Sequence, residues 1–98
     1  MKLVMAAAAI SELHDAAAFY TLKANVKLGL TFVAEFERAA NLILEKPLLG
    51  AEFRNNRRRY ILRRFPYGII YQVTPEELRI LAVAHHMRRP GYWIHRKE

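Results

Sequence analysis

Five arginines lie between residues 57 and 64 and form the densest set of anion-binding groups in the chain: Arg57, Arg58, Arg59, Arg63 and Arg64. A guanidinium group can form two parallel hydrogen bonds with a phosphate or a carboxylate. The same charges would also keep a solvated strand edge from pairing with other chains. If this stretch is a strand, alternation places Arg57, Arg59 and Arg63 on one face and the other two on the opposite face. The five therefore cannot share one site, and we interpret the cluster mainly as an interaction surface.

A second cluster, near the C-terminus, combines basic and aromatic side chains: Arg88, Arg89, Tyr92 and Trp93. Basic residues placed between aromatic ones can stack on exposed nucleic-acid bases. The rings could instead fold back and cover the core of a sheet, which we expect for Trp93. Tyr92 is the better candidate for a functional ring.

Two adjacent histidines, His85 and His86, lie at the end of a predicted strand. Neighbouring strand residues point to opposite faces, and no carboxylate lies at ligand spacing, so we expect no metal site. A histidine near arginines could act as a general base, although a structural hydrogen bond is the commoner role. His85 is the better candidate of the two. The chain has no glycine-rich phosphate loop, carboxylate pair or serine triad, so we expect no cofactor.

The excess positive charge lies entirely in the second half of the chain. Residues 1–53 carry five basic and six acidic side chains, a net charge of −1, whereas residues 54–98 carry eleven basic and three acidic ones, a net charge of +8. Self-repulsion of this kind destabilises a compact domain. We therefore expect a partner with negative charge: a nucleic acid, an enzyme that acts on one, or an acidic binding protein.

Length and composition limit the class of protein. We expect residues 1–98 to form one domain, since 53% of the residues are hydrophobic and can build a core. The chain has no cysteine, which excludes disulfides and thiolate sites and is typical of the reducing cytoplasm. No apolar stretch approaches the roughly 20 residues of a membrane span.

The first half of the chain has the periodicity of helices. Residues 2–5 form a candidate strand, and the alanine-rich stretch that follows predicts a helix over residues 6–23. Its apolar stripe consists of Ile10, Leu13, Ala17 and Tyr20. A second helix is predicted for residues 26–46, before Pro47, with an apolar face of Leu28, Phe32, Phe36, Ala39, Ile43 and Leu44. The short connection predicts an antiparallel hairpin.

The second half has the periodicity of strands. Strands are predicted at residues 58–65, 67–73 and 78–85, with turns at Pro66 and at residues 74–77. In the last strand, alternation places Ile80, Ala82 and Ala84 opposite to Leu81, Val83 and His85. Residues 86–98 form a basic, aromatic and irregular tail. Together, a short N-terminal strand, an antiparallel helical hairpin and a small antiparallel sheet predict an α+β domain.

Three motifs of the second half are specific enough to compare with known families. They are Arg64-Phe65-Pro66-Tyr67-Gly68-Ile69-Ile70-Tyr71, Ala82-Val83-Ala84-His85 and Arg88-Arg89-Pro90-Gly91-Tyr92-Trp93. With the order of the predicted elements, they resemble the RelE/ParE superfamily of toxins from bacterial type II toxin–antitoxin modules, which are associated with plasmid stabilisation. The resemblance extends over essentially the whole chain.

The resemblance implies one of two mechanisms. RelE-like members cut mRNA on the ribosome with basic residues that activate the 2′-hydroxyl, which a phenol such as that of Tyr92 could orient. ParE-like members share the fold, poison DNA gyrase and have no known nuclease chemistry. The RelE-like pattern has an arginine where this chain has Gly68 and a lysine where it has Ile61. Because neither residue can donate a proton or hold a phosphate, the departure favours the ParE-like branch.

We therefore predict a cytoplasmic ParE-like toxin that inhibits DNA gyrase, is not an enzyme, and is neutralised by a cognate acidic antitoxin in a hetero-oligomer. One alternative is a RelE-like mRNA endonuclease acting with the ribosome through Arg63, His85, Arg89 and Tyr92, with Arg59 beside them. Another is a non-toxic relative that binds nucleic acid. The residues predicted to bind the target or the antitoxin are Arg57, Arg59, Arg63, Arg64, Arg88, Arg89, Tyr92 and Trp93.

Overall fold

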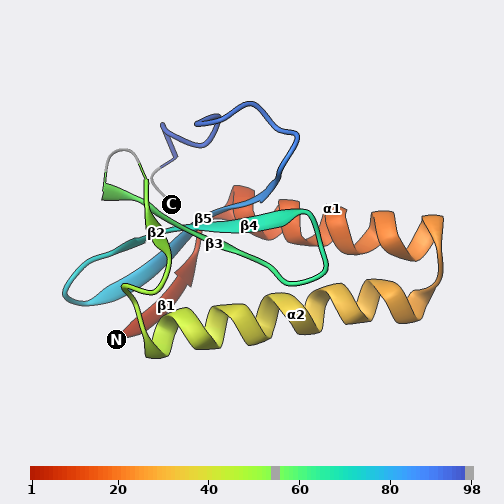
Figure 1. Cartoon of the computed structure of the whole chain (residues 1–98), viewed down its shortest axis with the longest axis horizontal. Coiled ribbons are helices and arrows are strands. Elements are labelled where there is room, and N and C mark those ends of the chain that lie inside the picture. Colours follow the sequence, from red (N-terminus) through yellow and green to blue (C-terminus); the bar gives the residue numbers. More distant parts are fainter. Residues whose placement is uncertain (54–55, 97–98) are drawn as a thin grey trace.

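The computed structural model describes residues 1–53 and 56–96, which form a helical hairpin packed on a sheet (Figure 1). In chain order the elements are β1 (Lys2–Met5), α1 (Ala7–Lys23), α2 (Val26–Glu45), β2 (Ala51–Glu52), β3 (Arg58–Ile61), β4 (Tyr67–Val73) and β5 (Glu77–His85). The predicted α+β class, with an antiparallel helical hairpin on a small sheet, is confirmed.

The sheet is mixed, whereas the sequence predicted an antiparallel one. Within the described residues it has five strands in the order β1-β5-β4-β3-β2. The strands from β2 to β5 form antiparallel pairs, but β1 lies parallel to β5. The hairpin and the meander separate β1 from β5 along the chain, and such a long connection allows a parallel pair. The sequence did not predict β2, because two residues carry no periodicity.

The two helices cross closely at Gly29. A Cβ atom at this position would lie 2.0 Å from Thr21 Oγ1 and 2.9 Å from the carbonyl oxygen of Ala17, so a larger residue would push α2 away from α1. The turn before α2 is fixed by Asn25, whose Oδ1 accepts a hydrogen bond from the Leu28 amide at 2.8 Å. No helix in the described ranges combines the length and apolar character that crossing a membrane requires.

The main core lies between the hairpin and the sheet. Phe32 and Ile43 of α2 pack there against Ile69, Tyr71 and other buried residues of the strands. The predicted apolar face of α2 is confirmed. In α1, the predicted stripe is wrong at its first position, because Ile10 is 40% exposed.

The alternation predicted for the last strand is right for Ala82 and Ala84 against Val83, but a β-bulge makes it wrong for Ile80. The register between β4 and β5 shifts at Leu81, which has no partner of its own between Ile80 and Ala82. After the bulge, Val83 lies on the helix-facing side with Ile80, while Ala82 packs in a second cluster on the other side of the sheet.

The strand predicted at residues 58–65 is also too long, since β3 ends at Ile61. Arg63 and Arg64 lie in the loop between β3 and β4, and Arg64 has a positive φ of 68°. The loop is held to α2 by Glu35, whose carboxylate accepts a hydrogen bond from the Arg63 amide at 2.7 Å. The alternation predicted for the five arginines therefore applies only to those of β3.

The C-terminal tail covers part of the sheet face opposite to the helices (Figure 1). Trp93 is only 2% exposed and packs with Ile70 and Ala82, which confirms that its ring folds back on the sheet. The tail is a succession of turns up to Arg96. The last two positions of the predicted tail, residues 97–98, lie outside the described residues.

Candidate functional site

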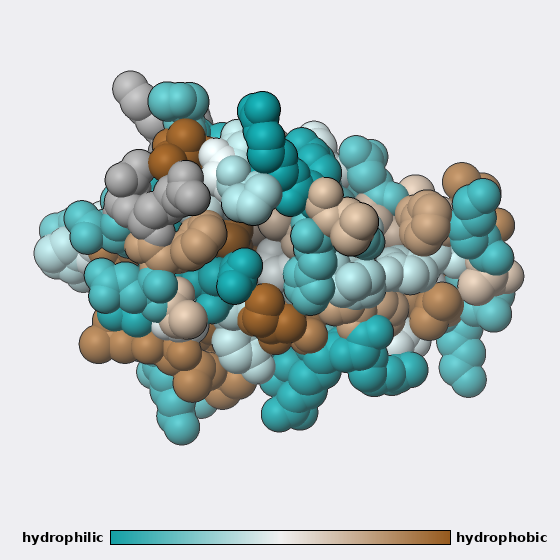
Figure 2. Space-filling view, turned by 45° about the horizontal axis from the view of Figure 1, so that its top comes forward, coloured by the Kyte–Doolittle hydropathy of each residue, from teal (hydrophilic) through white to brown (hydrophobic). Residues whose placement is uncertain are grey.

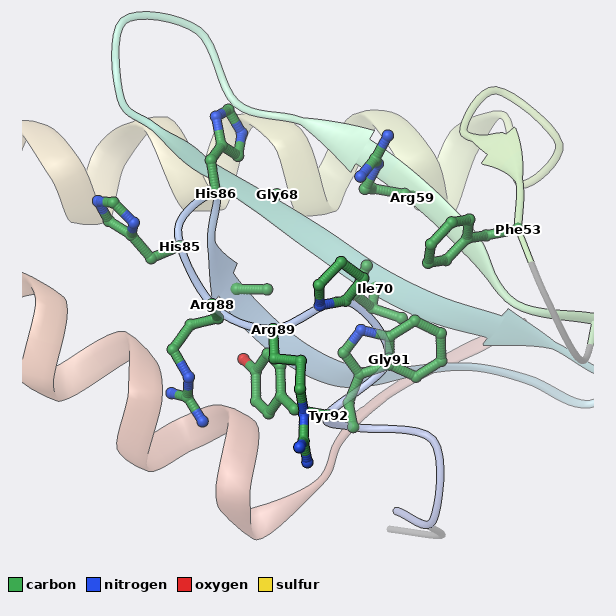
Figure 3. A pocket seen from close by; sticks show the side chains of 13 residues that line it. Phe53, Arg59, Gly68, Ile70, His85, His86, Arg88, Arg89, Gly91 and Tyr92 are labelled. Atoms are coloured by element: carbon green, nitrogen blue, oxygen red, sulfur yellow. The ribbon is translucent and has the colours of Figure 1, made fainter.

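The sheet face opposite to the helices, which we call the helix-free face, carries a small cavity of about 70 Å³ (Figure 3). Residues directly opposite each other in neighbouring strands share a face, so Arg59, Ile70 and Ala82 project together on this side. The cavity is lined by Phe53, Arg59, Gly68, Ile70, Ala84, His85, His86, Arg88, Arg89, Pro90, Gly91, Tyr92 and Trp93. It brings together β3, β4, β5 and the tail.

Of the predicted arginine cluster at residues 57–64, only Arg59 lines the cavity. Arg59 is exposed at its border, and its guanidinium carbon lies 5.2 Å from the centroid of the Phe53 ring. Arg58 points the other way and donates a hydrogen bond of 2.8 Å to the carbonyl oxygen of Gly50, so it stabilises the connection after α2. Arg57 is half-buried just before β3, and the two arginines of the β3–β4 loop are exposed away from the cavity.

The two histidines diverge, as predicted for adjacent strand residues (Figure 3). The His85 ring packs edge-on against Tyr67 with centroids 4.9 Å apart, and its Nδ1 accepts a hydrogen bond from the Met87 amide at 3.0 Å. The His86 side chain is exposed. Among the described residues, no three acidic or histidine side chains are grouped so that they could hold a metal ion.

Tyr92 is committed to contacts within the chain. Its hydroxyl donates a hydrogen bond of 2.7 Å to Glu12 Oε2, and the guanidinium carbons of Arg88 and Arg96 lie 3.9 and 5.0 Å from its ring centroid. Burial raises the pKa of the phenol, and the Glu12 carboxylate raises that pKa further. Tyr92 therefore stays protonated at neutral pH, and its hydroxyl is directed at α1 and not into the cavity.

The acceptor for Tyr92, Glu12, is a residue that the sequence did not single out. Its carboxylate also accepts hydrogen bonds from the Val83 amide at 3.0 Å and from Arg96 Nη1 at 2.8 Å. Arg96 in turn donates to the carbonyl oxygen of Leu81 at 3.1 Å. One ion pair thus satisfies an amide and a carbonyl of β5 that have no strand partner after β1 ends. Glu12 lies 84 positions from Arg96, and no local spacing signals such a contact.

The two positions that depart from the RelE-like pattern lie side by side. Gly68 and Ile61 are paired across β3 and β4 on the helix-free face. A Cβ atom at Gly68 would lie 3.4 Å from Arg59 Cγ, which is close to ordinary contact, so the glycine is not required by crowding. A longer side chain there would project over the cavity. The side chains of Gly68 and Ile61 supply no acid, no base and no phosphate-binding group.

The surface around the cavity suits binding more than covalent chemistry. Its charged groups are arginines, and its floor is formed by Gly68, Ile70 and Ala84. On the face that Figure 2 presents, hydrophilic side chains are interspersed with exposed apolar ones. Such a surface can attract anionic groups and bury a few apolar side chains of a partner.

Comparison with known proteins gives a consistent result. A family model described as "ParE toxin of type II toxin-antitoxin system, parDE" matches residues 3–90. Among solved structures, the chain is similar to one titled "Chromosomal ParDE TA system from P. aeruginosa", with a TM-score of 0.78. The two are 18% identical, and the match covers 87% of this chain and 95% of the other, which supports the same fold. No curated protein sequence matches significantly.

Proposed function

The chain belongs to the ParE toxin family of type II toxin–antitoxin systems, and from this premise we propose that it inhibits DNA gyrase and is neutralised by a cognate antitoxin. The family match extends over nearly the whole length of the chain. Gyrase is proposed as the target because the ParE-like branch of the superfamily poisons this enzyme. The proposed setting is the cytoplasm, in a module that stabilises a plasmid or a chromosomal locus.

The observation that carries the choice of target is the pairing of Gly68 with Ile61. In an mRNA endonuclease of this fold, these neighbouring positions would supply charge to the scissile phosphate. Here Gly68 has no side chain and lies against the stem of Arg59, and the phenol that lines the cavity, that of Tyr92, donates its hydroxyl to Glu12. His85 Nδ1 is likewise occupied by the Met87 amide. A toxin that acts by binding a protein target needs none of these groups.

The charge distribution supports an acidic antitoxin. The segment after residue 53 carries a net charge of +8, and its exposed arginines are distributed over the helix-free face and the β3–β4 loop. An acidic chain that covers these surfaces would relieve their mutual repulsion. A disordered antitoxin would lose conformational entropy when it orders on the toxin, so a large contact area would be needed.

The proposal is tested by inducing the protein in bacterial cells, with and without a candidate antitoxin, chosen as a short acidic protein encoded beside its gene. We expect growth arrest that the neighbouring product reverses, together with relaxed plasmid DNA. Primer extension on mRNA from the arrested cells should show no cuts in phase with codons. Codon-phased cuts with normally supercoiled plasmid would instead establish the endonuclease. Normal growth at high expression would indicate a relative without toxicity.

A further inference from the structure

The arginines around the cavity of the helix-free face carry positive charge that the rest of the domain does not neutralise. No acidic side chain of the described residues lines the cavity. Arg59 and Arg89 are exposed at its border, and neither forms an ion pair with an acid in the described part of the chain. Arg88 has only a long contact of 3.9 Å with Glu12. The cavity is therefore a site that attracts anions.

The strands add no net negative charge to this face. Among the acids of the described strands, the register places only Glu77 on the helix-free side, and its carboxylate lies 2.7 Å from Arg79 Nη2. The two charges of this pair offset each other, and Lys2 lies opposite Glu77 on the neighbouring strand. The free charge of the face thus comes from Lys2 and from the arginines of the cavity.

The guanidinium groups lie on two sides of the cavity. Figure 3 shows Arg59 projecting from β3 on one side, while Arg88 and Arg89 project from the tail on the other. The floor between them includes Gly68 and Ala84, which are paired across β4 and β5 and carry at most one methyl group. Because the two sides point apart, a single small anion would contact only one of them. A polymer with repeating phosphates can contact both.

The aromatic rings of the cavity are already engaged within the chain. The Phe53 ring lies against Arg59, and its centroid is 5.7 Å from that of Trp93, which is itself buried. The Tyr92 ring is covered by Arg88, whose guanidinium carbon is 3.9 Å from the ring centroid. Stacking on the bases of a single strand needs a free ring face. The contact that the site favours is instead that of arginine with phosphate, which holds a nucleic acid without reading its sequence.

We infer that the helix-free face binds the phosphate backbone of duplex DNA, with Arg59 and Arg89 on separate phosphates. The inference rests on the proposed function and deepens it, because duplex DNA is what gyrase holds. An acidic protein segment would also need a pocket for apolar anchor side chains, and a cavity of about 70 Å³ with glycine and alanine in its floor is a poor one. A toxin that touches both gyrase and its DNA binds their complex more tightly than either alone.

Fluorescence anisotropy with the wild-type toxin and a short, labelled DNA duplex of mixed sequence tests the contact directly. The logarithm of the affinity should fall linearly with the logarithm of the salt concentration, with a slope of about one for each phosphate contacted. We expect Arg59→Gln and Arg89→Gln each to weaken binding by about tenfold at low salt and to reduce this slope by about one.

Lys27→Gln is the matched control, because Lys27 is an exposed cation of α2 and its loss changes the net charge equally. It should change the affinity for DNA by less than about twofold and leave the salt slope as in wild type. The emission of Trp93 should be the same in all three variants, which shows that the tail and the cavity remain folded.

The consequence for gyrase is measured with the double variant Arg59→Gln/Arg89→Gln. Trapping of cleaved DNA by gyrase should require about tenfold more of the double variant than of wild type. Lys27→Gln should be as potent as wild type. Raising the salt concentration should reduce the difference between wild type and the double variant, because the lost contacts are electrostatic.

Four outcomes would overturn the inference or the proposed function separately. If wild type inhibits gyrase and the double variant matches it in potency and in DNA affinity, the DNA contact is wrong and the proposed function stands. If potency falls but wild type does not bind duplex DNA, the arginines contact gyrase itself. A clear preference for single-stranded RNA over duplex DNA would overturn the inference as well. If duplex DNA binds through both arginines while gyrase is unaffected, the proposed function fails and the DNA contact stands.

Discussion

Replacing Glu12 should release the C-terminal tail from the rest of the domain. The Glu12 carboxylate joins α1 to β5 and to the tail, because it accepts hydrogen bonds from the Val83 amide, the Tyr92 hydroxyl and both terminal nitrogens of Arg96. Its side chain is 15% exposed, so water reaches the carboxylate poorly. Glu12→Ala removes every one of these contacts, whereas Glu12→Gln keeps one acceptor oxygen but loses the charge and replaces the other acceptor with an NH2 donor.

The loss of unfolding free energy depends on which former partners of Glu12 can form hydrogen bonds with water instead. A buried amide left without a partner, here that of Val83, costs about 1–3 kcal/mol, and a hydrogen bond to a charged group contributes about 1.5–3 kcal/mol. Arg96 and Tyr92 belong to a tail that can detach and become hydrated, which limits the total. We expect Glu12→Ala to lower the free energy of unfolding by about 2–4 kcal/mol and Glu12→Gln to lower it by about 1–2 kcal/mol.

Trp93 makes the effect visible, because it is the only tryptophan of the chain and is 2% exposed in the tail. Urea unfolding measures the free energy, and the emission of Trp93 in native buffer should shift to the red in Glu12→Ala. Asp15→Ala, a neighbouring exposed acid on α1, is the control and should change stability by less than about 0.5 kcal/mol. The reasoning is refuted if Glu12→Ala matches this control in stability and leaves the emission unchanged.

Three further predictions concern the hairpin, the connection after α2 and the response to acid. Gly29→Ala should destabilise the protein by about 1–3 kcal/mol in urea unfolding, despite the better helix propensity of alanine, because the added Cβ would meet Thr21 at 2.0 Å; equal or greater stability would show that the helices do not need this close approach. Tyr71→Phe should cost about 1–3 kcal/mol by the same assay, because the buried Tyr71 hydroxyl accepts from the Gly50 amide and donates to the Pro47 carbonyl, both at 2.8 Å; a neutral effect would mean that water replaces the hydroxyl. The pKa of Glu35 is lowered, chiefly by its hydrogen bond with Arg38, below the ordinary carboxyl value of 4.5. The stability that the ionised Glu35 carboxylate contributes is therefore present above pH 4.5 and is lost as the pH falls through the lowered pKa. We expect Glu35→Gln to be less stable than wild type at pH 7 and to lose less stability between pH 5 and pH 2. Parallel curves of stability against pH for the two proteins would contradict this.

The parts of the fold that follow from local patterns could be predicted from the sequence. The two helices were placed to within one or two residues, since apolar side chains recur along each at helical spacing and Pro47 marks the end of the second. The strand Tyr67–Val73 is rich in β-branched and aromatic residues and was predicted with its bounds. Trp93 was expected to fold back, because a large ring in a short irregular tail is most stable on an apolar face.

The parts that depend on distant contacts could not be predicted. The early end of β3 is imposed by Glu35, which lies 28 positions away and holds the Arg63 amide. The bulge at Leu81 changes which residues of β5 face the helices, and no local sequence feature marks it. Glu12 was missed because its partners are 71 to 84 positions distant. The predicted anion-binding arginines lie on several surfaces and do not form one cluster, because distant contacts such as that of Glu35 with the Arg63 amide decide where the loop residues lie.

The central claim is that this chain is a toxin of the ParE type that acts on gyrase, and a supercoiling assay with purified gyrase, relaxed plasmid and ATP tests it most directly. Toxin freed from its antitoxin should stop supercoiling and trap cleaved DNA on the enzyme, and prior addition of the antitoxin should abolish both effects. Gyrase that keeps full activity at toxin concentrations sufficient to block translation of a ribosome-bound mRNA would contradict the account.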